Sequence, residues 1–271
     1  MIHKQIPIRT EGSKPYARLV TYLWEASPEI PIEKRSFVLI CPGGGYEMTS
    51  DREAEAVAVS IMKMGFHAAV LRYSVKPAEF PTALLETARA VRIIRESAKE
   101  WQVDSEKIVI MGFSAGGHLA ASYSVFWNQS WLLEKTGAEA EQLRPNGLLL
   151  GYPVITAQKA FIHGASFRNL LGAQWSLEMQ ERMSVEKHVG AQVPRTFLWH
   201  TFADETVPVE NSLLWVQALC RYKIPVEFHL YEKGCHGLSL ANELTESQAR
   251  CCIQEECQSW LKLAEVWLKN L

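Results

Sequence analysis

Residues 111–120 read MGFSAGGHLA, and this short stretch decides the fold class. The apolar run KIVIMGF (107–113) before the serine predicts a buried strand, and residues 115–127 predict a helix. Gly112-Phe113-Ser114-Ala115-Gly116 therefore fits the pattern G-x-S-x-G at a strand-to-helix turn, which exposes a serine hydroxyl to the positive end of the helix. The pattern indicates a nucleophilic Ser114. The alternative is a glycine-rich turn without chemistry.

Short apolar runs alternate with helix-period segments on both sides of this turn. Strands are expected at 35–41, 67–74, 107–113, 146–154, 195–201 and 225–232, with an antiparallel edge strand within 17–26. Helices are expected at 51–65, 82–101, 115–127, 209–222 and 245–269. This alternation predicts an α/β fold with a mostly parallel sheet and helices on both faces. We expect one domain over 1–271, in which 155–193 form a small cap insertion.

The composition excludes several classes of protein. Hydrophobic residues make up 48% of the 271 residues and charged residues 21%, which suits a large core and not a disordered chain. The net charge of -2 offers no basic surface for nucleic acid. No run reaches the roughly 18 apolar residues of a membrane span, and the N-terminus does not resemble a signal peptide. We therefore expect a cytoplasmic protein without a nucleic-acid or membrane partner.

The six cysteines do not form a metal-binding pattern. Three of them crowd into RCCIQEEC (250–257), but no CxxC pair exists, so neither a metal nor another cofactor is expected. Periodicity assigns at least one of these three to the core. Cys235 is a chemically plausible nucleophile beside His236, but adjacent residues of one loop rarely converge on each other. We interpret Cys235 as a bystander.

A nucleophilic serine needs a general base, and the base needs an orienting acid. At a strand–serine–helix turn of this kind, the acid and then the histidine follow the serine in the chain. Asp204 is the only aspartate after Ser114, and it lies just beyond the strand expected at 195–201. Glu205 is the alternative acid.

His236 is the histidine in the required position. It follows the last expected strand, in a loop bracketed by Gly234 and Gly237. His200 precedes Asp204, which is the wrong order, and His118 lies one helical turn beyond Ser114 and should point elsewhere. His229 lies within an expected strand, and no context supports His3, His67, His163 and His188.

A second glycine-rich stretch, LICPGGGYEMTS (39–50), follows the strand expected at 35–41. A G-x-G-x-x-G phosphate loop needs glycine at 48, where Met48 stands, and a P-loop needs a lysine that does not occur before Lys63. A tight turn without any binding role remains an alternative interpretation, although it does not explain three consecutive glycines at the carboxyl end of a strand.

Taken together, these motifs resemble α/β-hydrolase-fold carboxylesterases, in particular the compact bacterial acetyl-xylan esterases and sugar esterases. The matching segments, in family order, are PGGGY (42–46), VLRYSV (70–75), VDSEKIVIMGFSAGGHLAA (103–121), GYPV (151–154), HTFADETVPVENS (200–212) and HLYEKGCHGLSLA (229–241). Pro42 stands where the hormone-sensitive-lipase-like pattern has a histidine, and this departure favours the sugar-esterase branch.

The resemblance implies a serine esterase with Ser114 as nucleophile, Asp204 as orienting acid and His236 as general base. It also implies that backbone N–H groups of Gly44, Gly45 and Ala115 stabilise the oxyanion. On this basis Gly44→Val should lower turnover far more than stability.

The implied substrate is a small-molecule ester, with short acyl groups, acetyl first, on xylo-oligosaccharide-type carbohydrates. Several aromatic residues are candidates for the pocket, each with core packing as the alternative: Tyr46, Trp127 and Trp175, and also Trp131, Phe161 and Phe167. Alternatives in function are a generalist short-chain carboxylesterase, an aryl-formamidase or, more remotely, a catalytically silent ligand-binding fold. Assembly into a homo-oligomer stays open.

Overall fold

The computed structural model describes residues 1–271 and contains one sheet of eight strands in the order β1-β2-β4-β3-β5-β6-β7-β8. The strands are β1 (Gln5–Pro7), β2 (Arg18–Tyr22), β3 (Arg35–Cys41), β4 (His67–Arg72), β5 (Val103–Phe113), β6 (Gly147–Gly151), β7 (Thr196–Thr201) and β8 (Val226–Tyr231). Strands β3 to β8 are parallel, whereas β1 and β2 are antiparallel to their neighbours. This architecture confirms the predicted α/β-hydrolase fold.

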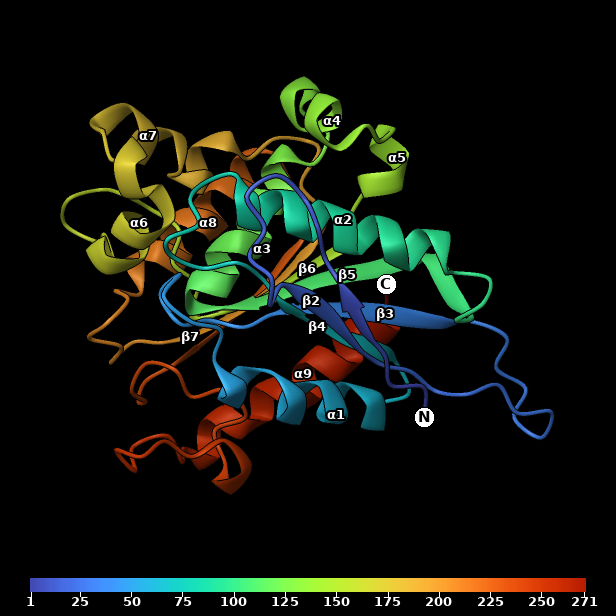
Figure 1. Ribbon diagram of the computed structural model, residues 1–271. Coiled ribbons are helices and arrows are strands. Elements are labelled where there is room, and N and C mark those ends of the chain that lie inside the picture. The colour runs from blue at the N-terminus through green and yellow to red at the C-terminus, as the bar shows by residue number, and fades with distance from the viewer.

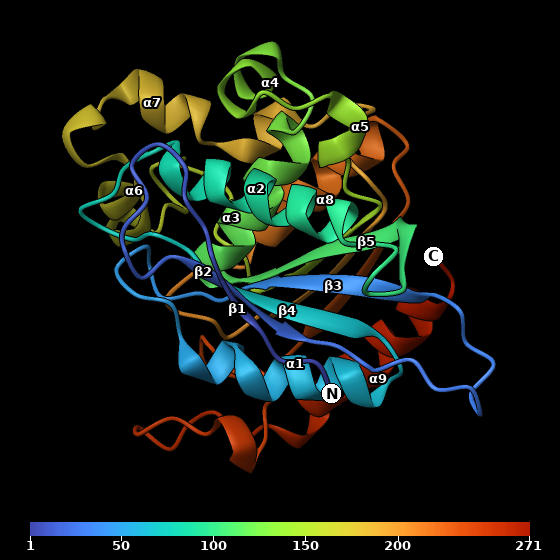
Figure 2. The same cartoon turned by 45° about the vertical axis from the view of Figure 1, so that its right-hand side comes forward.

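Helices cover both faces of the sheet (Figures 1 and 2). On one face lie α2 (Thr82–Glu96), α3 (Ser114–Phe126) and α8 (Glu210–Arg221), and on the other lie α1 (Glu55–Lys63) and α9 (Glu255–Lys269). The shorter helices are η1 (Asp51–Glu53), α4 (Ser130–Thr136), α5 (Ala140–Leu143), α6 (Gly164–Leu171), η2 (Gly172–Gln174), α7 (Leu177–Arg182), η3 (Val185–His188) and η4 (Glu243–Thr245). None of the helices combines the length and apolar character that crossing a membrane requires.

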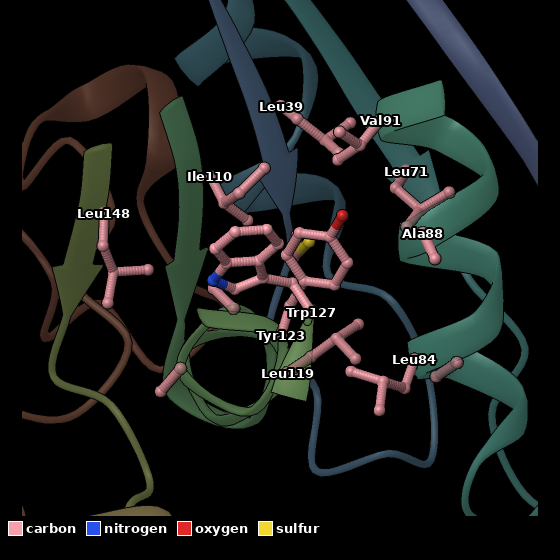
Figure 3. Packing of buried hydrophobic residues seen from close by; sticks show 14 of the residues in the cluster. Leu39, Leu71, Leu84, Ala88, Val91, Ile110, Leu119, Tyr123, Trp127 and Leu148 are labelled. Atoms are coloured by element: carbon pink, nitrogen blue, oxygen red, sulfur yellow. The ribbon is translucent and has the colours of Figure 1, made fainter. Parts of the chain in front are cut away.

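The core consists of two clusters, one on each face of the sheet. Successive strand residues point to opposite faces, so Leu39 packs toward α2 and α3 while Val38 packs toward α1 and α9. Figure 3 shows Leu39, Ile110 and Leu148 on the first face, against side chains of α2 and α3. The alternation therefore gives each face of the sheet its own apolar core.

The last helix begins ten residues later than the sequence predicts. The expected helix covers 245–269, but α9 starts at Glu255, and Ile253 within the expected range is 44% exposed. The carboxylate of Glu246 accepts hydrogen bonds from the backbone N–H groups of Ser247 (2.7 Å) and Cys252 (3.0 Å). A side chain that binds nearby backbone groups competes with helix formation, which explains the error.

Residues 155–193, expected to be a cap, lie between β6 and β7 and contain α6, η2, α7 and η3. The side-chain amide of Asn169 in this segment donates to the carbonyl oxygen of Gly45 (2.8 Å). The segment therefore contacts the glycine loop that follows β3. A cap over this edge of the sheet stays our prediction.

Candidate active site

Ser114 lies at the junction of β5 and α3, with a left-handed φ of 51°. The turn is tight, because a Cβ atom at Gly112 would lie 2.1 Å from the carbonyl oxygen of Gly116. A Cβ atom at Gly116 would lie 2.1 Å from the carbonyl oxygen of Cys41. Real Cβ atoms do not approach backbone so closely, so this turn requires glycine at both positions. The two glycines let the strand reverse into the helix with Ser114 at the bend.

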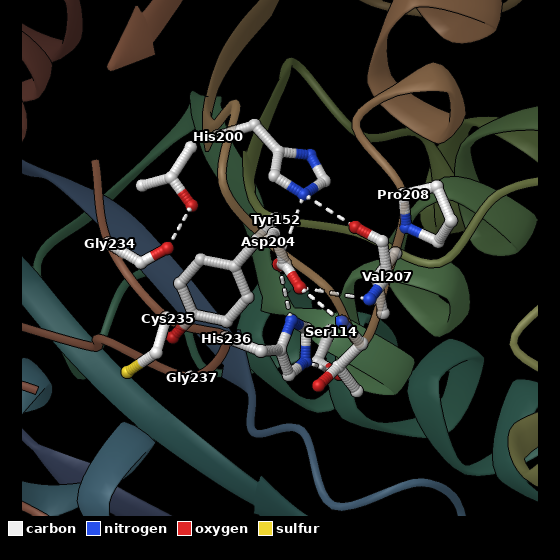
Figure 4. Close-up of polar contacts among 12 residues, drawn as sticks. Ser114, Tyr152, His200, Asp204, Val207, Pro208, Gly234, Cys235, His236 and Gly237 are labelled. Atoms are coloured by element: carbon white, nitrogen blue, oxygen red, sulfur yellow. Dashed lines mark hydrogen bonds and ion pairs between the residues drawn. The ribbon is translucent and has the colours of Figure 1, made fainter. Parts of the chain in front are cut away.

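The structure brings Ser114, His236 and Asp204 into one hydrogen-bonded line (Figure 4). The Oγ of Ser114 is 2.7 Å from Nε2 of His236, and Nδ1 of His236 is 2.6 Å from Oδ2 of Asp204. Since a carboxylate can only accept, Nδ1 carries the proton and Nε2 is left to accept from the serine hydroxyl. This arrangement can remove a proton from Ser114.

Asp204 is held as a buried anion. Its Oδ1 accepts the backbone N–H groups of Thr206 and Val207, each at 2.9 Å, and its side chain has no exposed surface. Burial alone would raise the pKa of this carboxyl, but hydrogen bonds from His200 and His236 hold it well below its usual value. The neighbouring Glu205 is exposed.

His200 contacts the same carboxylate oxygen of Asp204 as His236 does. Its Nε2 donates to Oδ2 of Asp204 (3.2 Å) and to the carbonyl oxygen of Val207 (3.1 Å), while Nδ1 accepts from the Ser212 hydroxyl (2.6 Å). Burial lowers the pKa of His200, so the ring is neutral. Chain order correctly removes His200 from the choice of base, but it does not predict this supporting contact.

The glycine loop after β3 presents unused backbone donors beside Ser114. Gly43 donates its N–H to Oε2 of Glu53 (2.7 Å), whereas the N–H groups of Gly44 and Gly45 make no hydrogen bond within the chain. Ala115 lies in the first turn of α3, where N–H groups have no intrahelical acceptor. These donors suit an oxyanion, and that role stays a prediction.

Glu53 is a residue of the candidate site that the sequence reasoning missed. Its Oε1 accepts the hydroxyl of Tyr152 (2.6 Å), and that hydroxyl accepts the N–H of Ser239 (2.8 Å). The ring of Tyr152 packs edge-on against the ring of His236, with centroids 5.1 Å apart. Glu53 as a whole is only 4% exposed. Its carboxylate therefore connects the glycine loop to residues 232–239, the histidine loop that carries His236.

Of the six aromatic pocket candidates, three are buried, contrary to the expectation: Tyr46, Trp127 and Phe167. Tyr46 is 3% exposed, and its hydroxyl is bonded to Nδ1 of His118 (2.9 Å), whose Nε2 donates to the carbonyl oxygen of Met183 (2.9 Å). Burial lowers the pKa of His118 to about 4. Tyr46 therefore anchors the glycine loop to α3 and does not line an open pocket, contrary to the expectation.

Trp127 is also misassigned by the sequence. It follows the last residue of α3, so the helix carries it roughly 20 Å away from Ser114. Its ring packs in the core with Leu119 and Tyr123 (Figure 3), and its indole N–H donates to the carbonyl oxygen of Gln192 (3.0 Å). Trp175, in contrast, is 40% exposed under the guanidinium of Arg168, so it stays a pocket candidate.

A polar pair from the segment 155–193 borders the glycine loop. Nδ1 of His163 is 2.7 Å from Oγ of Ser166, and that oxygen would lie 3.9 Å from a Cβ atom at Gly45. Burial lowers the pKa of His163, and a positive charge on His236 lowers it further. The sequence has no signal for this proximity, because it depends on how the segment folds back.

Comparisons with known proteins agree with the resemblance drawn from the motifs. A protein-family model described as BD-FAE matches residues 27–219. Endo-1,4-beta-xylanase B of Butyrivibrio fibrisolvens is 39% identical over 218 residues, which cover 78% of this chain and 33% of that protein. The acetylxylan esterase of Xylanibacter ruminicola is 27% identical over 251 residues, which cover 91% of this chain and 48% of that protein. The chain thus spans between a third and a half of these two relatives.

A solved structure extends the similarity to the fold of the whole chain. The crystal structure of an acetyl ester-xyloside bifunctional hydrolase from Caldicellulosiruptor lactoaceticus matches with a TM-score of 0.85 and 32% sequence identity. The match covers 98% of this chain and 96% of that protein. These findings confirm the predicted resemblance to acetyl-xylan esterases.

Proposed function

Since this chain belongs to the BD-FAE family, we propose that it is a serine ester hydrolase that removes short acyl groups, acetyl first, from xylo-oligosaccharide-type carbohydrates. One observation carries the proposal: the unbroken line of hydrogen bonds, 2.7 Å and 2.6 Å long, from Ser114 through His236 to Asp204. A serine hydroxyl becomes a nucleophile when a positioned base takes its proton.

In the first half of the reaction, Ser114 attacks the ester carbonyl while Nε2 of His236 takes the hydroxyl proton. Asp204 stays ionised, because its low pKa keeps it an acceptor, and it stabilises the imidazolium that forms. His236 then gives the proton to the leaving alcohol. The product of this half is an acyl-enzyme on Ser114.

The negative charge of the tetrahedral intermediate develops on the former carbonyl oxygen. The unused N–H groups of Gly44 and Gly45, with that of Ala115, are the proposed donors to this oxygen. Removing one such donor typically raises the barrier by roughly 2.7–4 kcal/mol. In the second half of the reaction, His236 activates water, which releases the acid and restores Ser114.

The relatives support the carbohydrate part of the proposal. The acetylxylan esterase and the acetyl ester-xyloside hydrolase are similar to this chain over nearly all of its length. The polar pair of His163 and Ser166 beside Gly45 offers hydrogen-bonding groups to an alcohol of the substrate. A small-molecule ester is the proposed binding partner.

Ser114→Ala tests the nucleophile directly. We expect turnover of p-nitrophenyl acetate to fall by about three orders of magnitude or more, because the acyl-enzyme can no longer form. Ser122→Ala is the matched control, since Ser122 lies on the same helix, is buried and has an unpaired hydroxyl. It should keep wild-type turnover. A folded wild type without any Ser114-dependent turnover of short esters would instead indicate a silent ligand-binding protein.

Substrate preference needs a separate comparison. Acetylated xylo-oligosaccharides should be hydrolysed with a higher kcat/KM than p-nitrophenyl butyrate if the protein is a sugar esterase. The reverse order would favour the generalist short-chain carboxylesterase.

A further inference from the structure

Three cysteines from two separate loops meet beside the candidate base. Cys235 lies in the histidine loop, and Cys251 and Cys252 lie in the loop that precedes α9. The Sγ atom of Cys235 is 2.9 Å from that of Cys251 and 3.5 Å from that of Cys252. The interpretation of Cys235 as a bystander, made from the sequence, does not predict this cluster. Figure 4 shows the Cys235 side chain directed away from Asp204.

The closest two sulfur atoms are in different environments. Cys251 is exposed, whereas Cys235 is partly buried and donates both to Sγ of Cys251 and to its carbonyl oxygen (3.0 Å). That hydrogen bond, followed by one from Ser247, lowers the pKa of Cys251, while burial raises the pKa of Cys235. An exposed cysteine with a lowered pKa beside a less acidic partner is the arrangement of an attacking and a resolving cysteine.

We propose that Cys235 and Cys251 form a reversible dithiol–disulfide pair that is oxidised by low-molecular-weight disulfides. The Cys251 thiolate attacks one sulfur of such a disulfide and releases a thiolate, which leaves a mixed disulfide. Cys235 then loses its proton, attacks the sulfur of Cys251 and releases the second thiolate. Two protein thiols are oxidised and one small disulfide is reduced to two thiols.

The geometry suits this bond. A disulfide bond is about 2.05 Å long, so the two sulfur atoms at 2.9 Å need to approach by less than about 1 Å. The third sulfur raises the question of a thiophilic metal ion. Two of the cysteines are consecutive, and sulfur ligands of one zinc ion lie about 3.8 Å apart, which is farther than the closest pair here. The disulfide is therefore favoured, and metal binding is an outcome of the test.

The disulfide would act on the neighbouring base. Cys235 directly precedes His236, whose ring is held at 2.6 Å and 2.7 Å by its two partners. Because catalysis is sensitive to shifts of about 1 Å, pulling Cys235 toward Cys251 should lower turnover severalfold. This consequence rests on the proposed function, whereas formation of the disulfide does not.

The test treats the reduced full-length chain with oxidised glutathione and measures intact mass, peptide maps and p-nitrophenyl acetate turnover. Wild type should lose two hydrogen atoms, yield a peptide pair linked through Cys235 and Cys251, and recover both its thiols and its turnover on reduction. Cys251→Ser should form no such link and keep its turnover. Cys220→Ser, which removes an exposed cysteine on α8, is the matched control and should behave like wild type.

Three results would overturn the proposal: both thiols stay reduced, oxidation stops at a glutathione adduct, or added Zn²⁺ binds tightly and protects all three cysteines. A disulfide that leaves turnover unchanged would overturn its coupling to His236. If the protein has no esterase turnover at all, the mass and peptide map still decide whether the disulfide forms. Failure of the proposed esterase function is thereby distinguished from failure of the proposed disulfide.

Discussion

Gly44 and Gly45 are neighbours in the glycine loop, yet a side chain would meet different surroundings at each. A Cβ atom at Gly44, where φ is 121°, would lie 2.3 Å from the carbonyl oxygen of Met48. At Gly45, where φ is 66°, the nearest atom would be Oγ of Ser166 at 3.9 Å. A side chain would therefore disturb the loop at Gly44 and find room at Gly45.

We expect Gly44→Ala to lower both the free energy of unfolding and turnover, because the loop must move away from Met48. This revises the expectation from the sequence that substitution here spares stability. Gly45→Ala should cost only about 1–2 kcal/mol of stability, the usual price of left-handed backbone with a side chain. Urea unfolding and kcat/KM measure both effects. Equal losses of stability in the two variants would contradict the assigned contacts.

Ser114, Asp204 and His236 could be named from the sequence because each follows a strand and their order is diagnostic. Glu53 could not, since its contact with Tyr152 joins residues 99 positions apart and nothing in the local pattern announces it. The same holds for Tyr46 and Trp127, whose aromatic rings suit a pocket and a core equally well. Only packing separates these two roles.

At the scale of elements, Glu53 connects loops that follow different strands. One carboxylate oxygen accepts the N–H of Gly43 and the other accepts the hydroxyl of Tyr152, so both oxygens act as hydrogen-bond acceptors. Glu53→Gln should place an N–H group against either the N–H of Gly43 or the hydroxyl of Tyr152, which then loses its acceptor, and cost about 1–3 kcal/mol of stability. Because the glycine loop and the histidine loop both loosen, kcat should fall as well.

Denaturant unfolding and steady-state kinetics of Glu53→Gln check this prediction. Glu47→Gln, at an exposed residue of the same region, is the control for removing a charge. A loss of activity without any loss of stability would show that Glu53 does not act through these buried contacts.

The elements were predictable where hydrophobic periodicity was strong and not elsewhere. The range 35–41 predicted from an apolar run coincides with β3, and residues 210–221 of the predicted helix form α8. Residues 245–254 match a helical period by sequence, but the Glu246 carboxylate ties the backbone into a loop instead. The short edge strand β1 has too few residues to produce a pattern.

At the scale of the whole molecule, two buried histidines make stability depend on pH. Burial lowers the pKa of His67 and of His118 to about 4 in the folded protein. Between the usual value of about 6.5 and about 4, the unfolded chain therefore binds more protons than the folded one. Stability should be fully present above about pH 6.5 and fall as the pH drops through this window.

Fully buried His118 alone should contribute on the order of 3 kcal/mol to this loss. Urea midpoints measured between about pH 7.5 and about pH 4.5 test the prediction. His118→Gln, which cannot titrate, should have a shallower dependence than wild type, even if its stability at neutral pH is lower. A flat wild-type profile across the window would contradict it.

The hydrogen bond between Ser114 and His236 joins residues 122 positions apart in the chain, and this separation bears on folding kinetics. Contacts that close such long loops form late, since the entropy of loop closure is lost before the contact stabilises anything. After dilution from urea, the far-UV circular dichroism signal should therefore recover before esterase turnover does. Simultaneous recovery would mean that the long-range pairing forms together with the helices. Turnover would thus report the final step of folding.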